Sequence, residues 1–134
     1  MEKGDVARWL RHYMEAWKSY ERDAIVALFA DDASYQYHPW DEPIIGSQAI
    51  ADSWLGEGAY ADEEGWDKDE PGSYDAAYVP YAVDGDRAVA IGSSTYTNPD
   101  GSIRTIYENC FLVRFGEDGR CTELTEFFME RPGA

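Results

Sequence analysis

The sequence predicts an α+β fold in which helices pack on one face of a curved, mostly antiparallel sheet. Over the first third of the chain, apolar residues recur at the spacing of amphipathic helices. From Tyr74 onward, apolar and polar residues alternate, and three turn signals divide this part into four long strands in meander order. The 134 residues contain no internal repeat and no linker, so we expect a single domain over residues 1–134.

Three helices and one early strand are expected before the meander. The apolar stripe of the first helix consists of Val6, Trp9, Leu10, Tyr13, Ala16, Trp17 and Tyr20. Asp5 is available as its N-cap. A second helix is expected over residues 22–33, RDAIVALFADDA, and a strand over residues 33–38, ASYQYH. Ser47 is expected to cap a third helix, SQAIADSWL, which ends at Gly56.

The segment Gly56–Asp75 follows no period and is strongly acidic, with Lys68 as its single base. Tyr60 and Trp66 are its only apolar anchors. Such a long loop in a small domain is either a lid over a functional site or a disordered segment. The sequence leaves both interpretations open.

The last hairpin determines which side chains share a face of the sheet. The three turn signals are DG at residues 84–85, NPDG at 98–101 and GEDG at 116–119. If Gly116 pairs with Gly119, Asn109 faces Glu126 and Phe111 faces Leu124. A three-residue loop with a bulge at Gly119 would instead shift the register by one.

In the first register both faces of this hairpin are too apolar for simple exposure. One face carries Tyr107, Asn109, Phe111, Val113, Thr122, Leu124, Glu126 and Phe128. The other carries Ile106, Cys110, Leu112, Cys121, Phe127 and Met129 among charged residues. We therefore expect one face to cover the helices or a cavity and the other to meet a second chain.

Composition excludes two classes of partner. The net charge of −16, from 27 acidic and 11 basic residues, leaves no cationic surface for nucleic acid or for an anionic membrane. No apolar run is long enough for a membrane span or a signal peptide. Cys110 and Cys121 would lie too far apart in the hairpin for a disulfide, which suits a reducing cytoplasm.

The chain resembles the SnoaL-like and ketosteroid-isomerase branch of the nuclear transport factor 2-like superfamily. Tyr13, the segment DAIVALFADDASY at residues 23–35, Gly46, Ile50 and Trp54, followed by the meander, carry the resemblance. It implies a cone in which the curved sheet wraps three helices and encloses an apolar pocket. It also implies that the face with Asn109 and Glu126 lines this pocket, and that the other face forms a homodimer.

The resemblance to ketosteroid isomerase is partial. Tyr13 matches the phenol that donates a hydrogen bond to the enolate oxygen. The proton-shuttling aspartate falls on Tyr37 and the second oxyanion acid falls on Phe111. Because both acids are missing, we do not expect steroid isomerisation in that form. Other members, such as polyketide cyclases, dehydratases and epoxide hydrolases, place their acids elsewhere in the cone, so the site itself must indicate the function.

Glu126 is the main candidate for proton transfer, because a carboxylate on an apolar wall loses hydration and its pKa rises. Asn109 and Tyr13 would hold an oxygen of the substrate. The alternative is a buried glutamate that its neighbours satisfy without turnover. His38 and Asp41 could form a histidine–carboxylate base at the mouth of the cone, or simply belong to a solvated turn.

The remaining predicted site residues are pocket walls that bind substrate. They are Trp17, Tyr35, Tyr37, Trp40, Trp54, Tyr107, Phe111, Leu124 and Phe128. The two histidines, His12 and His38, lack the spacing of a zinc site, and no nucleotide-binding motif is present. We therefore expect neither a metal nor a cofactor.

Three functions fit the sequence. The first is a cofactor-independent enzyme that transfers a proton in an apolar or aromatic small molecule bearing a carbonyl. The second is a non-catalytic binding protein that uses the same aromatic pocket. The third is an interaction module whose cone is filled by Trp17, Trp54 or Trp66. An open cavity with a buried Glu126 would favour the enzyme.

Overall fold

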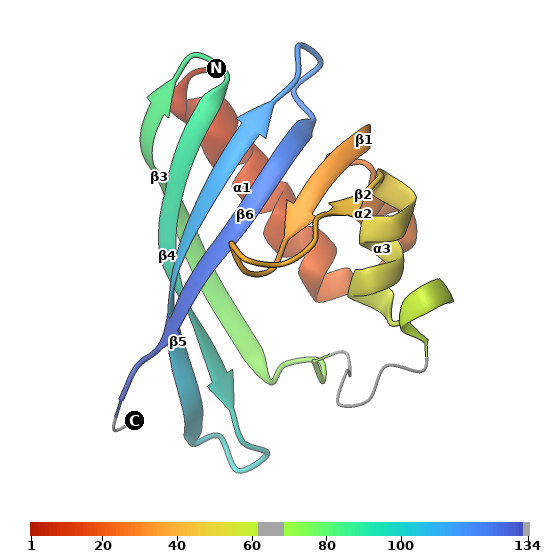
Figure 1. The fold of residues 1–134 in the computed structure, drawn as a ribbon. Coiled ribbons are helices and arrows are strands. Elements are labelled where there is room, and N and C mark those ends of the chain that lie inside the picture. The colour runs from red at the N-terminus through yellow and green to blue at the C-terminus, as the bar shows by residue number, and fades with distance from the viewer. Residues whose placement is uncertain (62–68, 133–134) are drawn as a thin grey trace.

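The computed structural model describes residues 1–61 and 69–132. Figure 1 shows the chain order of the elements. They are α1 (Lys3–Ser19), α2 (Arg22–Val26), β1 (Phe29–Gln36), β2 (Ile44–Ile45), α3 (Ser47–Leu55), the 3-10 turn η1 (Gly58–Tyr60), β3 (Tyr74–Asp84), β4 (Arg87–Thr97), β5 (Ile103–Phe115) and β6 (Cys121–Glu130). No helix among these residues has both the length and the apolarity that crossing a membrane requires.

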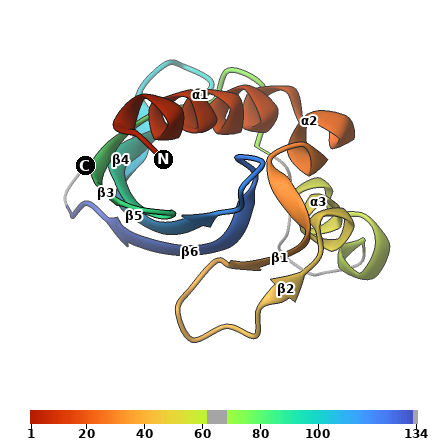
Figure 2. The ribbon, with the colours of Figure 1, turned by 90° about the horizontal axis from the view of Figure 1, so that it is seen from above.

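The strands form one six-stranded sheet in the order β2-β1-β6-β5-β4-β3. All neighbours are antiparallel except β1 and β6, which are parallel. Seen from above, the sheet curves around α1, with α2 and α3 beside its β1 end (Figure 2). The predicted α+β fold, with helices on one face of a curved sheet, is confirmed.

The helix ends differ from the prediction in three places. Asp5 is not the N-cap of α1 but lies one turn inside, where its carboxylate accepts the backbone N–H of Glu2 at 2.9 Å. Ser47 is already helical, and Gly46 with φ +101° is the N-cap of α3. The second helix ends at Val26, because Phe29 already pairs with β6 and is fully buried there. Tertiary packing thus overrides the helical pattern of the sequence.

The last hairpin is shifted by two residues from the predicted register. Its loop closes with the N–H of Gly116 donating to the carbonyl of Arg120 at 2.8 Å, which adds one residue. A bulge between Arg114 and Phe115 adds the second. Because side chains alternate between the two faces, a total shift of two residues leaves each side chain on its predicted face. The β5 residues up to Arg114 therefore keep their faces but have different cross-strand partners on β6. Beyond the bulge, Cys121 lies in the core and not on the outer face.

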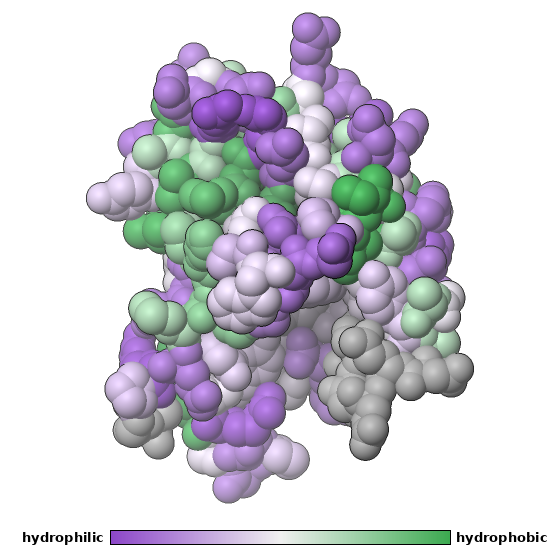
Figure 3. Space-filling model, viewed as in Figure 1, coloured by the Kyte–Doolittle hydropathy of each residue, from purple (hydrophilic) through white to green (hydrophobic). Residues whose placement is uncertain are grey.

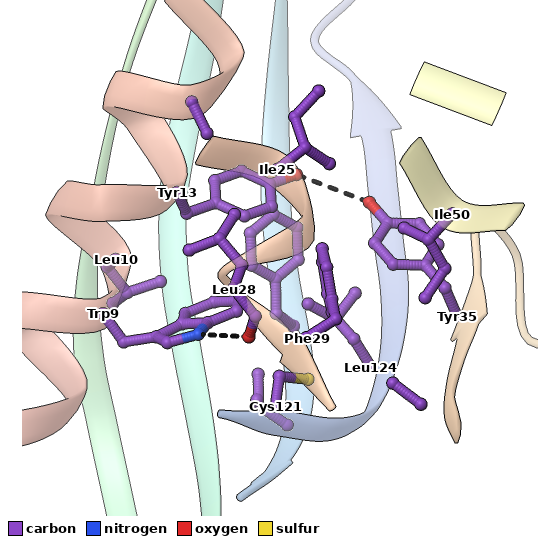
Figure 4. Packing of buried hydrophobic residues seen from close by; sticks show 14 of the residues in the cluster. Trp9, Leu10, Tyr13, Ile25, Leu28, Phe29, Tyr35, Ile50, Cys121 and Leu124 are labelled. Atoms are coloured by element: carbon purple, nitrogen blue, oxygen red, sulfur yellow. Dashed lines mark hydrogen bonds between the residues drawn. The ribbon is translucent and has the colours of Figure 1, made fainter. Parts of the chain in front are cut away.

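The core fills the space under the N-terminal half of α1. Figure 4 shows Trp9, Leu10 and Tyr13 of α1 packed against residues of α2, β1, α3 and β6. The indole N–H of Trp9 donates to the carbonyl of Leu28 at 3.1 Å and fixes α1 to the start of β1. Tyr13 and Ala16 extend this core into the C-terminal half of α1, and the candidate site borders it there, next to Tyr13 and Trp17.

Candidate functional site

A cavity of about 420 Å³ lies between the C-terminal half of α1 and the inner face of the sheet. This volume is in the range of small-molecule sites. The helices α1 and α3, the strands β1 and β3 to β6, and the loop residues beside them contribute its walls. The lining residues are Tyr13, Trp17, Tyr20, Tyr35, Tyr37, Trp54, Asp69, Tyr78, Ser94, Tyr96, Arg104, Thr105, Tyr107, Asn109, Glu126 and Phe128. Tyrosine is the commonest residue type among them, so the walls are apolar surfaces that carry hydroxyl groups.

Glu126 is the buried carboxyl group of this cavity, with 9% of its surface exposed. The hydroxyl of Tyr35 donates to its Oε2, while Oε1 has no hydrogen bond to any described residue. Burial raises the pKa of Glu126 to about 7, although the Tyr35 hydrogen bond and the charge of His38 act in the opposite direction. The group is therefore divided between its acid and base forms near neutral pH.

Glu126 and the phenols of Tyr35 and Tyr13 form a short chain of hydrogen-bonding groups. The hydroxyl oxygens of Tyr13 and Tyr35 are 3.5 Å apart, and a dashed line joins them in Figure 4. Because the Tyr35 proton goes to Glu126, the Tyr13 proton is the one shared between the two phenols. Burial, and then the charge of Glu126, raises the pKa of both hydroxyls well above the ordinary value. Both phenols are thus neutral donors over the physiological range.

Asn109 lies on the cavity wall but not opposite Glu126. Its cross-strand neighbour on β6 is Phe128, whereas Glu126 faces Phe111, because of the two-residue shift of the hairpin. The hydroxyl of Ser94 donates to Oδ1 of Asn109 at 3.1 Å. This bond orients the amide, and its Nδ2 group makes no hydrogen bond within the described part of the chain. Asn109 can therefore donate to a bound molecule.

His38 and Asp41 form the predicted pair. Nδ1 of His38 lies 2.9 Å from Oδ2 of Asp41, which also accepts the backbone N–H of His38 at 3.1 Å. The imidazole stacks on Trp40 at 4.9 Å and lies 5.1 Å from the ring of Phe128. The pair is thus at the edge of the cavity, in the loop between β1 and β2, and does not line it.

Three predicted wall residues do not border the cavity. Phe111 and Leu124 are almost fully buried in the core, and Phe111 supports the rings of Tyr13 and Tyr78 from behind. Trp40 is 78% exposed, because the loop after β1 turns it outward over His38. The other predicted residues, which are Tyr13, Trp17, Tyr35, Tyr37, Trp54, Tyr107, Asn109, Glu126 and Phe128, all line it.

Seven further described residues line the cavity and were not predicted from the sequence. They are Tyr20, Asp69, Tyr78, Ser94, Tyr96, Arg104 and Thr105. Alternation along β3 and β4 could have revealed Tyr78, Ser94 and Tyr96. Asp69 belongs to the acidic segment without a period, where no pattern distinguishes it. Trp66 and the acidic cluster at residues 62–64 lie outside the described residues, because residues 62–68 of the proposed lid are not described.

No metal centre is formed by the residues that the structure describes, since no group of three potential ligands comes together. The cavity itself offers phenols, one amide and one guanidinium beside its two carboxyl groups. Such a set holds oxygen atoms of an organic molecule and moves protons.

Comparison with family models gives a match over residues 10–124 to the SnoaL-like domain. The chain belongs to the SnoaL-like family. The match runs from α1 into β6 and ends at Leu124, so Glu126 and Phe128 lie just beyond it, and the fold is the cone of this family. The SnoaL-like domain is associated with small-molecule isomerases and cyclases. A search of curated proteins finds no match.

Glu126 is the direct cross-strand neighbour of Phe111. Tyr37 lines the cavity and shares a 2.9 Å hydrogen bond with Ser53. Phe111 and Tyr37 are the two positions at which the resemblance to ketosteroid isomerase implies acids, and the buried carboxyl group among the described lining residues is Glu126.

The raised pKa of Glu126 predicts a pH-dependent stability. Since the folded-state pKa of about 7 exceeds the ordinary 4.5, the stabilising contribution of Glu126 is fully present below 4.5 and is lost as the pH rises through 7. In Glu126→Gln this loss is absent. We expect the difference in unfolding free energy, variant minus wild type, to grow by about 2–3 kcal/mol from pH 5 to pH 8. Urea unfolding at both pH values measures it, and a pH-independent difference would contradict the raised pKa.

Proposed function

We propose that this protein is a cofactor-independent enzyme that transfers protons in a carbonyl-bearing small molecule, as an isomerase, cyclase or dehydratase. The observation that supports it most is Glu126, a buried carboxyl group on an open cavity with a pKa of about 7. One of its oxygens is held by Tyr35 and the other is unoccupied by any described residue. A general base works best when its pKa is near the working pH.

In the proposed reaction, Oε1 of Glu126 removes a proton from the carbon next to the carbonyl group. The electron pair of the broken C–H bond moves to the carbonyl oxygen, which becomes an enolate. Neutral donors on the wall stabilise this oxygen. The candidates are Nδ2 of Asn109 and the hydroxyl of Tyr13, whose proton would turn from Tyr35, 3.5 Å away, to the enolate. In a β,γ-unsaturated substrate the enolate is a dienolate, and return of the proton from Glu126 to its γ-carbon gives isomerisation. Attack of the enolate carbon on a second carbonyl carbon, whose oxygen takes up the proton, gives cyclisation. Expulsion of a β-hydroxyl group, which leaves as water with the proton, gives dehydration.

His38 and Asp41 have a separate role in this proposal. When Asp41 accepts the proton on Nδ1, the imidazole presents Nε2 as a base. The pair lies against Phe128 at the edge of the cavity, so it can exchange protons with solvent or supply one to a leaving hydroxyl group. A positive charge on His38 also lowers the pKa of Glu126, which couples the two groups.

The second candidate function is non-catalytic binding of an apolar or aromatic molecule in the same cavity. The desolvation of Glu126 favours the enzyme over this alternative, since a simple binding site gains nothing from a carboxyl group with a raised pKa. The interaction module is disfavoured. Trp17 and Trp54 line the cavity and do not fill it, while Trp66 lies outside the described residues.

We also propose that a single SnoaL-like domain over residues 1–134 acts as a cytoplasmic homodimer through the outer face of the sheet. Figure 3 looks onto this face and shows apolar residues gathered over β4, β5 and β6. Ile91 and Leu112 on neighbouring strands are 37% and 45% exposed. An exposed apolar patch of this kind is typical of an interface. Cys110 and Cys121 are both free thiols, which suits the cytoplasm.

Proton abstraction can be tested without knowing the natural substrate. In D₂O, we expect the wild type to accelerate loss of the α-proton NMR signals of the probe ketone 2-tetralone. Glu126→Gln should reduce this rate by at least about 10²-fold, because the base is removed while the shape is kept. Glu123→Gln, on the same strand but on the outer face, is the matched control and should exchange at the wild-type rate. Equal rates for both variants would remove Glu126 from the mechanism.

The dimer is tested by the molar mass in solution. Light scattering should give the wild type twice the chain mass of 15.2 kDa. Leu112→Glu places a charge in the proposed interface and should yield monomers at micromolar concentration. Ile45→Glu, at a more exposed apolar position on β2, should remain dimeric. A monomeric wild type, or a dimeric Leu112→Glu, would refute this interface.

A further inference from the structure

A bulge in β5 turns Arg104 into the cavity. Tyr96 of β4 pairs with Thr105 and the next residue, Thr97, pairs with Ile103, so Arg104 is an extra residue with no partner. Thr105 and Tyr107 face the cavity, and regular alternation would therefore place Arg104 on the outer face of the sheet. Instead its guanidinium carbon lies 5.3 Å from the ring centre of Tyr96, and Arg104 lines the cavity beside Thr105. Bulges commonly reorient a side chain in this way at functional sites.

Among the described residues Arg104 has no acidic partner, although acids far outnumber bases in this chain. Its side chain makes neither an ion pair nor a hydrogen bond within this part of the chain, and its guanidinium lies over the ring of Tyr96. Asp69 lines the same cavity, but its Oδ2 accepts the indole N–H of Trp17 at 3.2 Å and the hydroxyl of Tyr20 at 3.3 Å. The guanidinium is therefore held against a ring, and no described residue occupies its N–H groups.

Arg104 and Glu126 occupy different ends of the cavity. Glu126 is the cross-strand neighbour of Phe111, which follows Arg104 by seven residues along β5. Seven residues of strand separate the two backbone positions by roughly 23 Å at the usual rise. The side chains come closer together than this, because the charge of Glu126 still acts on Tyr96, over whose ring Arg104 lies. A molecule that contacts both groups is thus elongated, with its reactive carbon at Glu126 and a second polar group at Arg104.

We propose that Arg104 binds a carboxylate of the substrate, so that the substrates are elongated, apolar or aromatic keto acids. A guanidinium supported by an aromatic ring presents the planar pair of donors that matches a carboxylate. The charge of Asp69 at the same end favours a single carboxylate over a group with several negative charges. This inference rests on the proposed function, because it names the class of molecule that Glu126 acts on.

The test compares two isosteric probes, biphenyl-4-carboxylate and biphenyl-4-carboxamide, by calorimetry at pH 7.5. We expect the wild type to bind the carboxylate at least about 10-fold more tightly than the amide, the scale of one hydrogen-bonded charge. Arg104→Gln should bring the ratio of the two dissociation constants to about 1, and should change the affinity for the amide less than about 3-fold. Arg104→Lys keeps the charge without the planar donors and should retain part of the preference.

Arg11→Gln removes one unpaired arginine from the exposed side of α1 and is the matched control, which should keep the full ratio. Glu126→Gln should also keep the full ratio of the two dissociation constants. Loss of proton exchange in Glu126→Gln and loss of carboxylate preference in Arg104→Gln are therefore separate results. A wild type that binds both probes equally, or fails to bind the carboxylate at millimolar concentration, would overturn the role of Arg104. An unchanged ratio in Arg104→Gln would do the same.

Discussion

The burial of one carboxyl group among phenols is the constraint on which the site depends. Glu126 has lost most of its hydration, and from the described residues it receives a single hydrogen bond, from Tyr35. That one bond does not compensate for the lost water, so the neutral acid and the carboxylate are of similar free energy near pH 7. The same imbalance that lowers stability at high pH supplies a base that can take up a proton and return it.

The fold maintains this burial by placing β6 between two neighbours. On one side, β1 pairs in parallel and brings Tyr35 opposite Leu124, next to Glu126. On the other side, β5 places Phe111 directly across from Glu126. On α1, Tyr13 lies 5.5 Å from the ring of Phe111 and covers the pair. Each neighbour is itself part of the core, so the carboxyl group cannot reach water without disturbing the packing.

Parts of this arrangement could be read from the sequence because they follow from periodicity. The stripe on α1 identified Tyr13 and Trp17, and alternation in the last two strands placed Asn109 and Glu126 on one face. The cross-strand partners of these residues could not be predicted from the sequence. The loop at residues 116–120 shifts the register by one, as the alternative with a bulge at Gly119 had allowed. The second shift, between Arg114 and Phe115, has no distinct sequence signal. Arg104 is the clearest case, since alternation assigns it to the wrong face and only the bulge reverses this.

The most direct test of this account is a ¹³C NMR titration of the carboxyl carbons, with the Glu126 resonance assigned by its absence in Glu126→Gln. The account predicts that this carbon titrates with a pKa of about 7. A midpoint near the ordinary value of 4.5 would mean that the carboxyl group is well hydrated. In that case the proposed general base would not stand.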